Sequence, residues 1–268
     1  MPRASALLTV MINAARKAAR GLQRDFGEIE ALQVARKGAA DFVTAADVRA
    51  EEILFEELNK ARPKYGFVME ERGAVEGADN SNRWIVDPLD GTTNFMHGLA
   101  HFAISIGLER DRQPFAGVVY NPVTDELFTA EKGEGAFVND QRLRVSGRRD
   151  LTECLFACGL PFKGRSTDAG RAQALKETDR VLSETAGIRR FGSAALDLAF
   201  VAAGRYDAFW ERGLAPWDVC AGIVLVREAG GIVSEIEDGD KPLSGPSILA
   251  SNGHIHDDAR RIVRGPTL

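Results

Sequence analysis

The sequence has few cysteines, no long apolar run and no concentration of positive charge. Its 268 residues include three cysteines, Cys154, Cys158 and Cys220, with no CxxC pair. An odd number without that spacing argues against a disulfide framework and a zinc knuckle, so we expect a reducing compartment. No segment approaches the roughly 20 apolar residues that a membrane span requires. We therefore expect a cytoplasmic protein with no membrane partner.

Neither the net charge nor the spacing of the histidines indicates a binding site for nucleic acid or metal. A net charge of −5 gives no long-range attraction for a polyanion, so nucleic-acid binding is not evident. His97, His101, His254 and His256 lack metal-ligand spacing, and we expect them in loops or at edges. No GxxxxGKS or GxxxxGKT segment is present, which argues against a P-loop NTPase.

Apolar periodicity predicts a globular chain of mixed structure. A first helix carries Leu8 to Leu22 on one face, a second ends at Pro63, and later helices are expected at 168–184, 193–203 and 216–229. Short strands ending on acids are expected at 66–70 and 83–87, followed by an antiparallel run to about Val145. We predict an α+β or layered α/β fold in two lobes, 1–140 and 141–268.

The segment 84–95, WIVDPLDGTTNF, places Asp87 and Asp90 three residues apart at the end of an apolar strand. Clustered carboxylates repel one another unless a cation joins them, and oxygen ligands favour Mg²⁺ over zinc or copper. An isolated DPxDG could be a simple surface turn. Here the following Gly91, Thr92 and Thr93 could present N–H groups and hydroxyls to an anion. Metal ligands beside an anion cradle indicate phosphate chemistry.

Three other acids could have either a structural role or a role in the same site. Glu70 follows the strand before this segment, and it would reach the same sheet edge if the two strands are neighbours. Asp218 lies in the first turn of a helix, where the helix dipole alone favours an acid. Thr44 and Asp47 have the spacing of a capping box. Capping and catalysis are compatible at that position.

With these residues in view, the sequence resembles the inositol monophosphatase family, and it is most similar to the bacterial, SuhB-like branch. WIVDPLDGTTNF at 84–95 and PWDVCAGIVLVREAGG at 216–231 match its two signature motifs. DFVTAAD at 41–47, the Glu70-Glu71 pair and FGSAALDLAFVAAGRYDAFWE at 191–211 extend the resemblance to nearly the whole chain. The resemblance implies an αβαβα sandwich, a Mg²⁺ requirement, lithium inhibition and a homodimer.

The resemblance also implies roles for individual residues. Glu70, Asp87 and the Leu89 carbonyl would bind one Mg²⁺, and Asp87, Asp90 and Asp218 a second, with a third, weaker ion near Glu70. Thr92 and Asp47 would orient and deprotonate a water. The phosphate would lie on Gly91, Thr92 and Thr93. The substrate ring would contact Gly192, Ser193, Ala194 and Glu211. Asp218 would also lie beside the substrate.

The sequence predicts the type of reaction more specifically than it predicts the substrate. A small phosphorylated polyol, myo-inositol 1-phosphate above all, is the best guess because Glu211 could accept hydrogen bonds from two neighbouring hydroxyls. Relatives with the same metal motifs act on histidinol phosphate, adenosine 3′,5′-bisphosphate or fructose 1,6-bisphosphate. Some bacterial relatives also associate with the transcription machinery, so a regulatory role is a further alternative. Either Arg36 or Lys37 could supply a basic group to the site.

Overall fold

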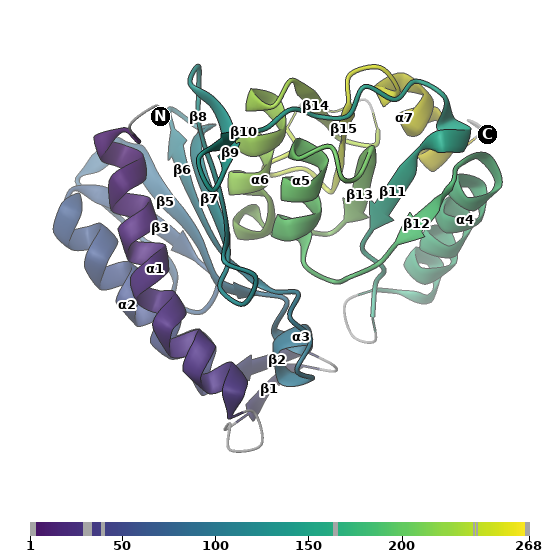
Figure 1. Ribbon diagram of the computed structural model, residues 1–268. Helices are drawn as coiled ribbons and strands as arrows, with labels where there is room; N and C mark the ends of the chain where they lie inside the picture. Colours follow the sequence, from purple (N-terminus) through teal and green to yellow (C-terminus); the bar gives the residue numbers. More distant parts are fainter. Residues whose placement is uncertain are drawn as a thin grey trace.

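The computed structural model describes residues 4–28, 34–38, 41–162, 166–237, 239 and 241–265, and only the backbone of residues 34–38 and 41–43. Within these residues the elements stack in five layers of helix, sheet, helix, sheet and helix (Figure 1). One cluster of buried apolar side chains lies between the first two layers, a second surrounds the central helices, and a third lies under the last helices. This arrangement confirms the predicted αβαβα sandwich.

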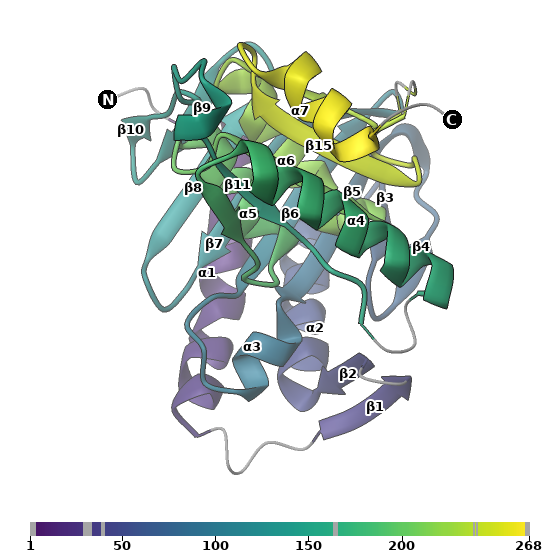
Figure 2. The same cartoon turned by 90° about the vertical axis from the view of Figure 1, so that its right-hand side faces the viewer.

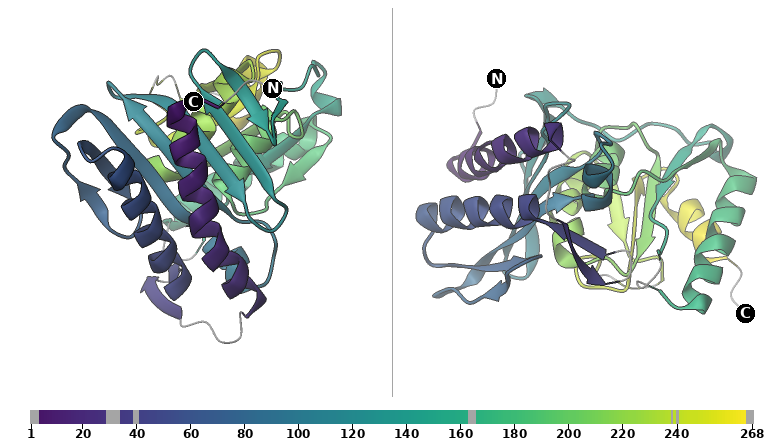
Figure 3. Two further views of the ribbon diagram at one scale, coloured as in Figure 1. Left: turned by 60° about the vertical axis from the view of Figure 1, so that its left-hand side comes forward. Right: turned by 90° about the horizontal axis from the view of Figure 1, so that it is seen from below.

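The outer helices of the first layer have the apolar faces that the sequence predicts. Helix α1 begins after Ser5, whose hydroxyl accepts the Leu8 N–H, and it buries Met11 and Leu22 against the first sheet. Helix α2 ends two residues before Pro63 and buries Leu54 and Leu58. Both helices lie side by side on the outer face of that sheet (Figure 3). Their bounds are α1 Ala6–Gly27 and α2 Ala45–Ala61.

The first sheet has eight strands in the order β10-β9-β8-β7-β6-β5-β3-β4. From β5 to β10 it is an antiparallel meander, as expected, whereas β3 and β5 run parallel as neighbours. Glu70, which directly follows β3, therefore lies at the same edge of the sheet as the end of β5, as expected for neighbouring strands. The bounds are β3 Tyr65–Met69, β4 Gly73–Val75, β5 Asp79–Asp90, β6 Ala103–Arg110, β7 Gln113–Asn121, β8 Glu126–Glu131, β9 Gly135–Val138 and β10 Gln141–Arg142.

The second sheet has five strands in the order β12-β11-β13-β15-β14, with β11 parallel to both β12 and β13. The central helices α5 and α6 pack between the two sheets, and α4 and α7 cover the far face of the second sheet (Figure 2). The bounds are β11 Leu155–Cys158, α4 Asp168–Glu184, β12 Gly187–Arg189, α5 Ala194–Ala202, β13 Ala208–Arg212, α6 Pro216–Glu228, β14 Gly231–Ser234, β15 Ser247–Asn252 and α7 His256–Arg264.

Three short elements complete the fold. A small antiparallel sheet of β1 (Val34–Gly38) and β2 (Asp41–Thr44) leads into α2, and α3 (Thr92–Met96) follows β5 at the same end of the molecule (Figure 1). A single 3₁₀ turn, η2 (Leu151–Glu153), precedes β11. The chain passes from the first sheet to the second between β10 and β11, close to the proposed lobe boundary at 140/141. Among the described helices, none combines the length and apolar character needed to cross a bilayer.

His256 corrects one expectation. It does not lie in a loop or at an edge, because it begins α7 and is only 6% exposed. Its Nδ1 lies 2.7 Å from the Ser251 hydroxyl and its Nε2 lies 2.9 Å from the Ser234 hydroxyl. Both ring nitrogens are thus satisfied, which allows the ring to be buried. Burial lowers the pKa of His256 to about 4, so the ring stays neutral.

Candidate active site

A bulge at the end of β5 brings two of the predicted acids to one side of the strand. Asp87 pairs with Ser105 on β6, whereas Asp90 pairs with Ala103, so three steps on β5 match two on β6. Residues three apart on a regular strand point to opposite faces. One extra residue in a bulge turns the second acid to the same face as the first. Asp87 and Asp90 therefore both line a cavity of about 330 Å³.

Asp218 reaches this cavity from α6, which lies between the sheets. It sits in the first turn of the helix, and its carboxylate accepts the Ala215 N–H at 2.7 Å. Two glycines of the first sheet let the helix approach this closely. A Cβ on Gly107 would lie 2.4 Å from the Cys220 sulfur, and one on Gly117 would lie 2.5 Å from the Ala221 carbonyl oxygen. The missing side chains on β6 and β7 thus help to place Asp218.

The three aspartates form a tight acidic cluster. Asp87, Asp90 and Asp218 each offer a carboxylate oxygen, and these oxygens lie within 4.8 Å of one another. Burial raises the pKa of Asp87 and Asp218 well above the usual range, and the neighbouring charges raise it further. The pKa of Asp90 rises to about 6 through burial, although hydrogen bonds from α5 oppose the shift. Negative charge is therefore concentrated at this end of the cavity.

The donor atoms of the cluster fit a hard divalent cation. Among the described residues that line the cavity there is no histidine and no cysteine. The oxygen-only set excludes the usual zinc and copper ligands and suits Mg²⁺. A cation among the carboxylates would remove the repulsion that raises their pKa values. The cluster is therefore a candidate metal centre.

Two further predicted ligands line the same cavity. Glu70 directly follows β3, and its N–H donates to the Val86 carbonyl of the neighbouring strand at 3.2 Å. The charge of Glu70 is the largest electrostatic cause, after burial, of the raised pKa of Asp87. Leu89 donates its N–H to Asp87 Oδ1 at 2.9 Å, which fixes the turn between the two aspartates. The structure thus brings Glu70 and Leu89 beside the aspartates.

Asp47 and Thr92 are joined by a hydrogen bond across two separate segments. The Thr92 hydroxyl lies 3.1 Å from Asp47 Oδ1 and 3.2 Å from the Leu89 carbonyl, either of which can accept its proton. Asp47 Oδ2 accepts the Thr44 N–H at 2.9 Å and the Thr44 hydroxyl, so the capping box is confirmed. Burial raises the pKa of Asp47 to about 6. One carboxylate therefore caps α2 and also holds Thr92 at the cavity.

The turn after Asp90 leads from β5 into a short helix beside the cavity. Gly91 has a φ of 97°, in the left-handed region that favours glycine. It precedes the short helix α3, whose first N–H groups have no partner within the helix. Gly91, Thr92 and Thr93 all line the cavity beside the acids. The predicted Gly-Thr-Thr turn and the acidic cluster therefore face a common space.

The start of α5 joins the second half of the chain to Asp90. The Ser193 hydroxyl donates to Asp90 Oδ2 at 2.6 Å, and the Ala195 N–H donates to the same oxygen at 2.8 Å. Ser193 is fully buried and does not line the cavity, whereas Gly192 and Ala194 do. The structure thus gives Ser193 a role in holding an acid. Its predicted contact with the substrate ring stays a prediction.

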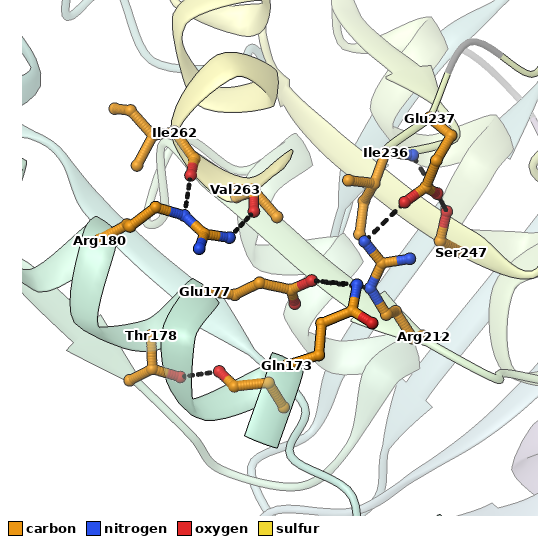
Figure 4. A network of polar contacts seen from close by, with 11 residues as sticks. Gln173, Glu177, Thr178, Arg180, Arg212, Ile236, Glu237, Ser247, Ile262 and Val263 are labelled. Atoms are coloured by element: carbon orange, nitrogen blue, oxygen red, sulfur yellow. Dashed lines mark hydrogen bonds and ion pairs between the residues drawn. The ribbon is translucent and has the colours of Figure 1, made fainter. Parts of the chain in front are cut away.

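Glu211 enters the cavity from the end of β13. The next residue, Arg212, donates to Glu177 at 2.8 Å and to Glu237 at 2.7 Å, as Figure 4 shows. Ser247 donates in turn to Glu237 at 3.0 Å. Successive residues on a strand point to opposite faces, so these ion pairs anchor β13 on the face away from Glu211.

Several residues of the cavity were missed by sequence reasoning. Gly159, Phe162, Arg190 and Leu214 also line it, and they come from segments that carry no recognisable local pattern. Asp197 lies buried nearby, with no partner for Oδ1 among the described residues. Burial and then the charge of Glu211 raise the pKa of Asp197 well above its usual range. Only the pattern of an acid inside a very apolar helix could have drawn attention to it.

The choice between Arg36 and Lys37 falls outside the described side chains. Both residues belong to β1, of which the structure describes the backbone alone.

Comparison with known proteins identifies relatives over almost the whole chain. The model of the inositol monophosphatase family matches residues 4–264. An inositol-1-monophosphatase of Mesorhizobium japonicum is 56% identical over 98% of this chain and 97% of the relative. The Nus factor SuhB of Escherichia coli K12 is 43% identical over 93% of this chain and 92% of the relative.

Solved structures show the same fold. The extragenic suppressor protein suhB of Bartonella henselae has a TM-score of 0.94 and 53% identity, covering 98% of this chain and all of that one. The inositol monophosphatase of Anabaena sp. PCC 7120 has a TM-score of 0.86 and 37% identity, covering 98% of this chain and 97% of that one. The fold thus agrees with the sequence relationship.

Proposed function

We propose, from the premise that this chain belongs to the inositol monophosphatase family, that it hydrolyses myo-inositol 1-phosphate in a Mg²⁺-dependent reaction. Relatives that are 54–58% identical carry the name inositol-1-monophosphatase, so the chain is a phosphomonoester hydrolase. The observation that carries the proposal is the shared cavity. Asp87, Asp90 and Asp218 meet there beside the Gly-Thr-Thr turn, which joins cation ligands to an anion cradle.

The acids would hold about two to three Mg²⁺ ions. Glu70, Asp87 and the Leu89 carbonyl would hold the first ion, and Asp87 would share the second with Asp90 and Asp218. When bound, these cations would neutralise charge on the phosphate and lower the pKa of a water. The hydrogen bonds from Ser193 and Ala195 to Asp90 leave its other oxygen available to a cation.

Thr92 and Asp47 would move the proton of the attacking water. The Thr92 hydroxyl donates to Asp47 Oδ1, so its oxygen can accept a hydrogen bond from water at the cavity. The proton could then pass through Thr92 to Asp47. A carboxylate with a pKa of about 6 is a better proton acceptor than an ordinary aspartate. No covalent intermediate on the protein is required.

The two remaining groups of residues would hold the substrate. The Gly91, Thr92 and Thr93 turn would bind the phosphate oxygens. Glu211 would accept hydrogen bonds from two neighbouring hydroxyls of the alcohol, with Gly192, Ser193 and Ala194 beside the ring. A polyol phosphate is favoured over an ester without hydroxyls, because only hydroxyls can replace the water molecules that the substrate displaces from the Glu211 carboxylate.

The test is phosphate release by the purified protein from four substrates. They are inositol 1-phosphate, histidinol phosphate, adenosine 3′,5′-bisphosphate and fructose 1,6-bisphosphate, each with Mg²⁺, with EDTA and with added lithium. We expect Mg²⁺-dependent, lithium-sensitive release that is fastest from inositol 1-phosphate. Faster release from another compound would keep the metal reaction and reject the substrate.

Two further proposals rest on the relatives. The 43% identity to the Nus factor SuhB of Escherichia coli favours a regulatory, transcription-associated role as a second candidate function. Failure to release phosphate from any substrate, together with binding to transcription proteins, would support that role over catalysis.

The family resemblance also favours a homodimer, for which light scattering after size exclusion should give about twice the chain mass of 29.1 kDa.

A further inference from the structure

Gly159 lies directly beside Glu211 at the ends of two parallel strands. Cys158, the last residue of β11, pairs with Trp210 on β13, and the Gly159 N–H donates to the Trp210 carbonyl at 3.3 Å. Both Gly159 and Glu211 line the cavity. The register of the second sheet therefore puts a residue without a side chain next to the acid expected to bind the substrate alcohol.

The Glu211 carboxylate occupies the space that a side chain at position 159 would need. A Cβ built on Gly159 would lie 1.8 Å from Glu211 Cδ, 1.9 Å from Oε2 and 2.0 Å from Oε1. Ordinary contact begins near 3.4 Å, so even alanine would force the carboxylate to move by more than 1 Å. Gly159 does not have the left-handed backbone of Gly91 or Gly192. Space for Glu211 is therefore the structural reason for glycine at this position.

The Glu211 carboxylate is the end of a flexible side chain, so it would shift more readily than the backbone around it. Arg212 is anchored on the other face of β13 by Glu177 and Glu237, so the strand cannot easily move away from β11. Asp197 and Asp218 both lie within electrostatic range of Glu211 and repel its charge. A carboxylate displaced from Gly159 would take a different place in the cavity or leave it. Its position relative to the substrate alcohol would change in either case.

We propose that Gly159 is a specificity-determining residue, which lets the Glu211 carboxylate lie against β11 where it can accept hydrogen bonds from neighbouring hydroxyls of a polyol phosphate. This inference rests on the proposed function, because Glu211 selects a polyol only if the protein hydrolyses one. Gly159 acts through Glu211 and takes no part in the reaction itself. Alanine at 159 should therefore resemble loss of the Glu211 carboxylate.

The experiment is a double-mutant cycle in the full-length protein with Mg²⁺. The variants are Gly159→Ala, Glu211→Ala and the pair together, with Gly147→Ala as control because nothing lies within 4 Å of its Cβ position. The readout is the preference ratio, meaning kcat/KM for inositol 1-phosphate divided by kcat/KM for p-nitrophenyl phosphate, which has no hydroxyls. A wild type that releases no phosphate from inositol 1-phosphate would reject the proposed function itself.

We expect Gly159→Ala to lower the preference ratio about tenfold, the effect of roughly one lost hydrogen bond. In the Glu211→Ala background the same change should have no further effect, because the smaller side chain removes the clash. An unchanged ratio in Gly159→Ala, or equal effects in both backgrounds, would overturn the inference, while hydrolysis of inositol 1-phosphate by the wild type would still support the proposed function.

Thermal unfolding gives a readout that does not depend on the substrate. If Gly159→Ala is too unstable to assay, the Glu211→Ala background should restore its melting temperature, since the overlap disappears. A double variant as unstable as the single one would show that Gly159 is needed for another reason, and would overturn the inference.

Discussion

The two sides of the cavity are built in different ways. On the acidic side, one continuous segment, 87–93, supplies two of the three clustered aspartates and the proposed anion cradle, and Glu70 and Asp218 come from elsewhere. On the side formed by the second sheet, Gly159 follows β11, whereas Glu211 and Leu214 lie about 50 positions later, at and after the end of β13. We infer that much of the proposed reaction depends on one segment, whereas the proposed selection of the alcohol depends on how two strands pack together.

Asp90→Asn should have the largest effect, because it removes charge from the acidic side. We expect kcat to fall by at least about 10²-fold for every phosphomonoester, with the fold retained. Steady-state kinetics and circular dichroism would measure both properties. Asp140→Asn, an exposed turn residue outside the cavity, is the matched control. Turnover close to wild type in Asp90→Asn would reject the metal role of Asp90.

Thr92→Val should have the next largest effect. Valine keeps the shape of the side chain but removes the hydroxyl that joins the cavity to Asp47. We expect kcat to fall roughly ten- to thirtyfold for all substrates, with little change in their relative rates. Thr124→Val, at an exposed position, is the control. A change in substrate preference without a loss of kcat would place Thr92 with the selective side of the cavity instead.

Much of the fold and of the acidic side could be predicted because local sequence determines them. The apolar faces of α1 and α2 and the strands ending on acids follow from periodicity and turn residues. The bulge that turns Asp87 and Asp90 to one face could not be derived, because the register is set by pairing with β6. Only the family resemblance predicted that Asp87 and Asp90 would act at the same site.

The other side was less accessible to sequence reasoning. Gly159 carries no side chain and stands in no recognisable motif, so only the parallel pairing of β11 with β13 reveals its position beside Glu211. Ser193 has the position of a helix cap, but its hydroxyl bond to Asp90 joins residues 103 apart in sequence. His256 was misplaced because its burial depends on two serines from other strands.

Glu211→Ala should change selection more than rate. We expect the preference for inositol 1-phosphate over p-nitrophenyl phosphate to fall about tenfold, since the hydroxyls lose their acceptor. Competition between the two substrates, with Glu153→Ala as an exposed control, would measure it. Equal slowing of both substrates would contradict a role in binding the alcohol.

The smallest expected effect is on stability, and it concerns the acidic side alone. Folding raises the pKa of Asp47 and Asp90 to about 6, so the folded state binds more protons than the unfolded state between about pH 4 and 6. Without metal, these acids should therefore lower stability as the pH rises through this range.

Melting temperatures at pH 4.5 and pH 7 in EDTA would show the effect. Between pH 4.5 and pH 7, we expect the melting temperature of the wild type to fall by a few degrees relative to that of Asp90→Asn. Adding Mg²⁺ at pH 7 should reverse this relative loss. A difference that does not depend on pH would contradict the repulsion inferred for the cluster.

The most direct test of the two-sided cavity compares Asp90→Asn and Glu211→Ala in one assay, with inositol 1-phosphate and p-nitrophenyl phosphate as substrates. The account predicts that Asp90→Asn lowers kcat/KM for both by the same large factor, whereas Glu211→Ala lowers the ratio between them. An altered ratio in Asp90→Asn with an unaltered ratio in Glu211→Ala would contradict the division between reaction and selection.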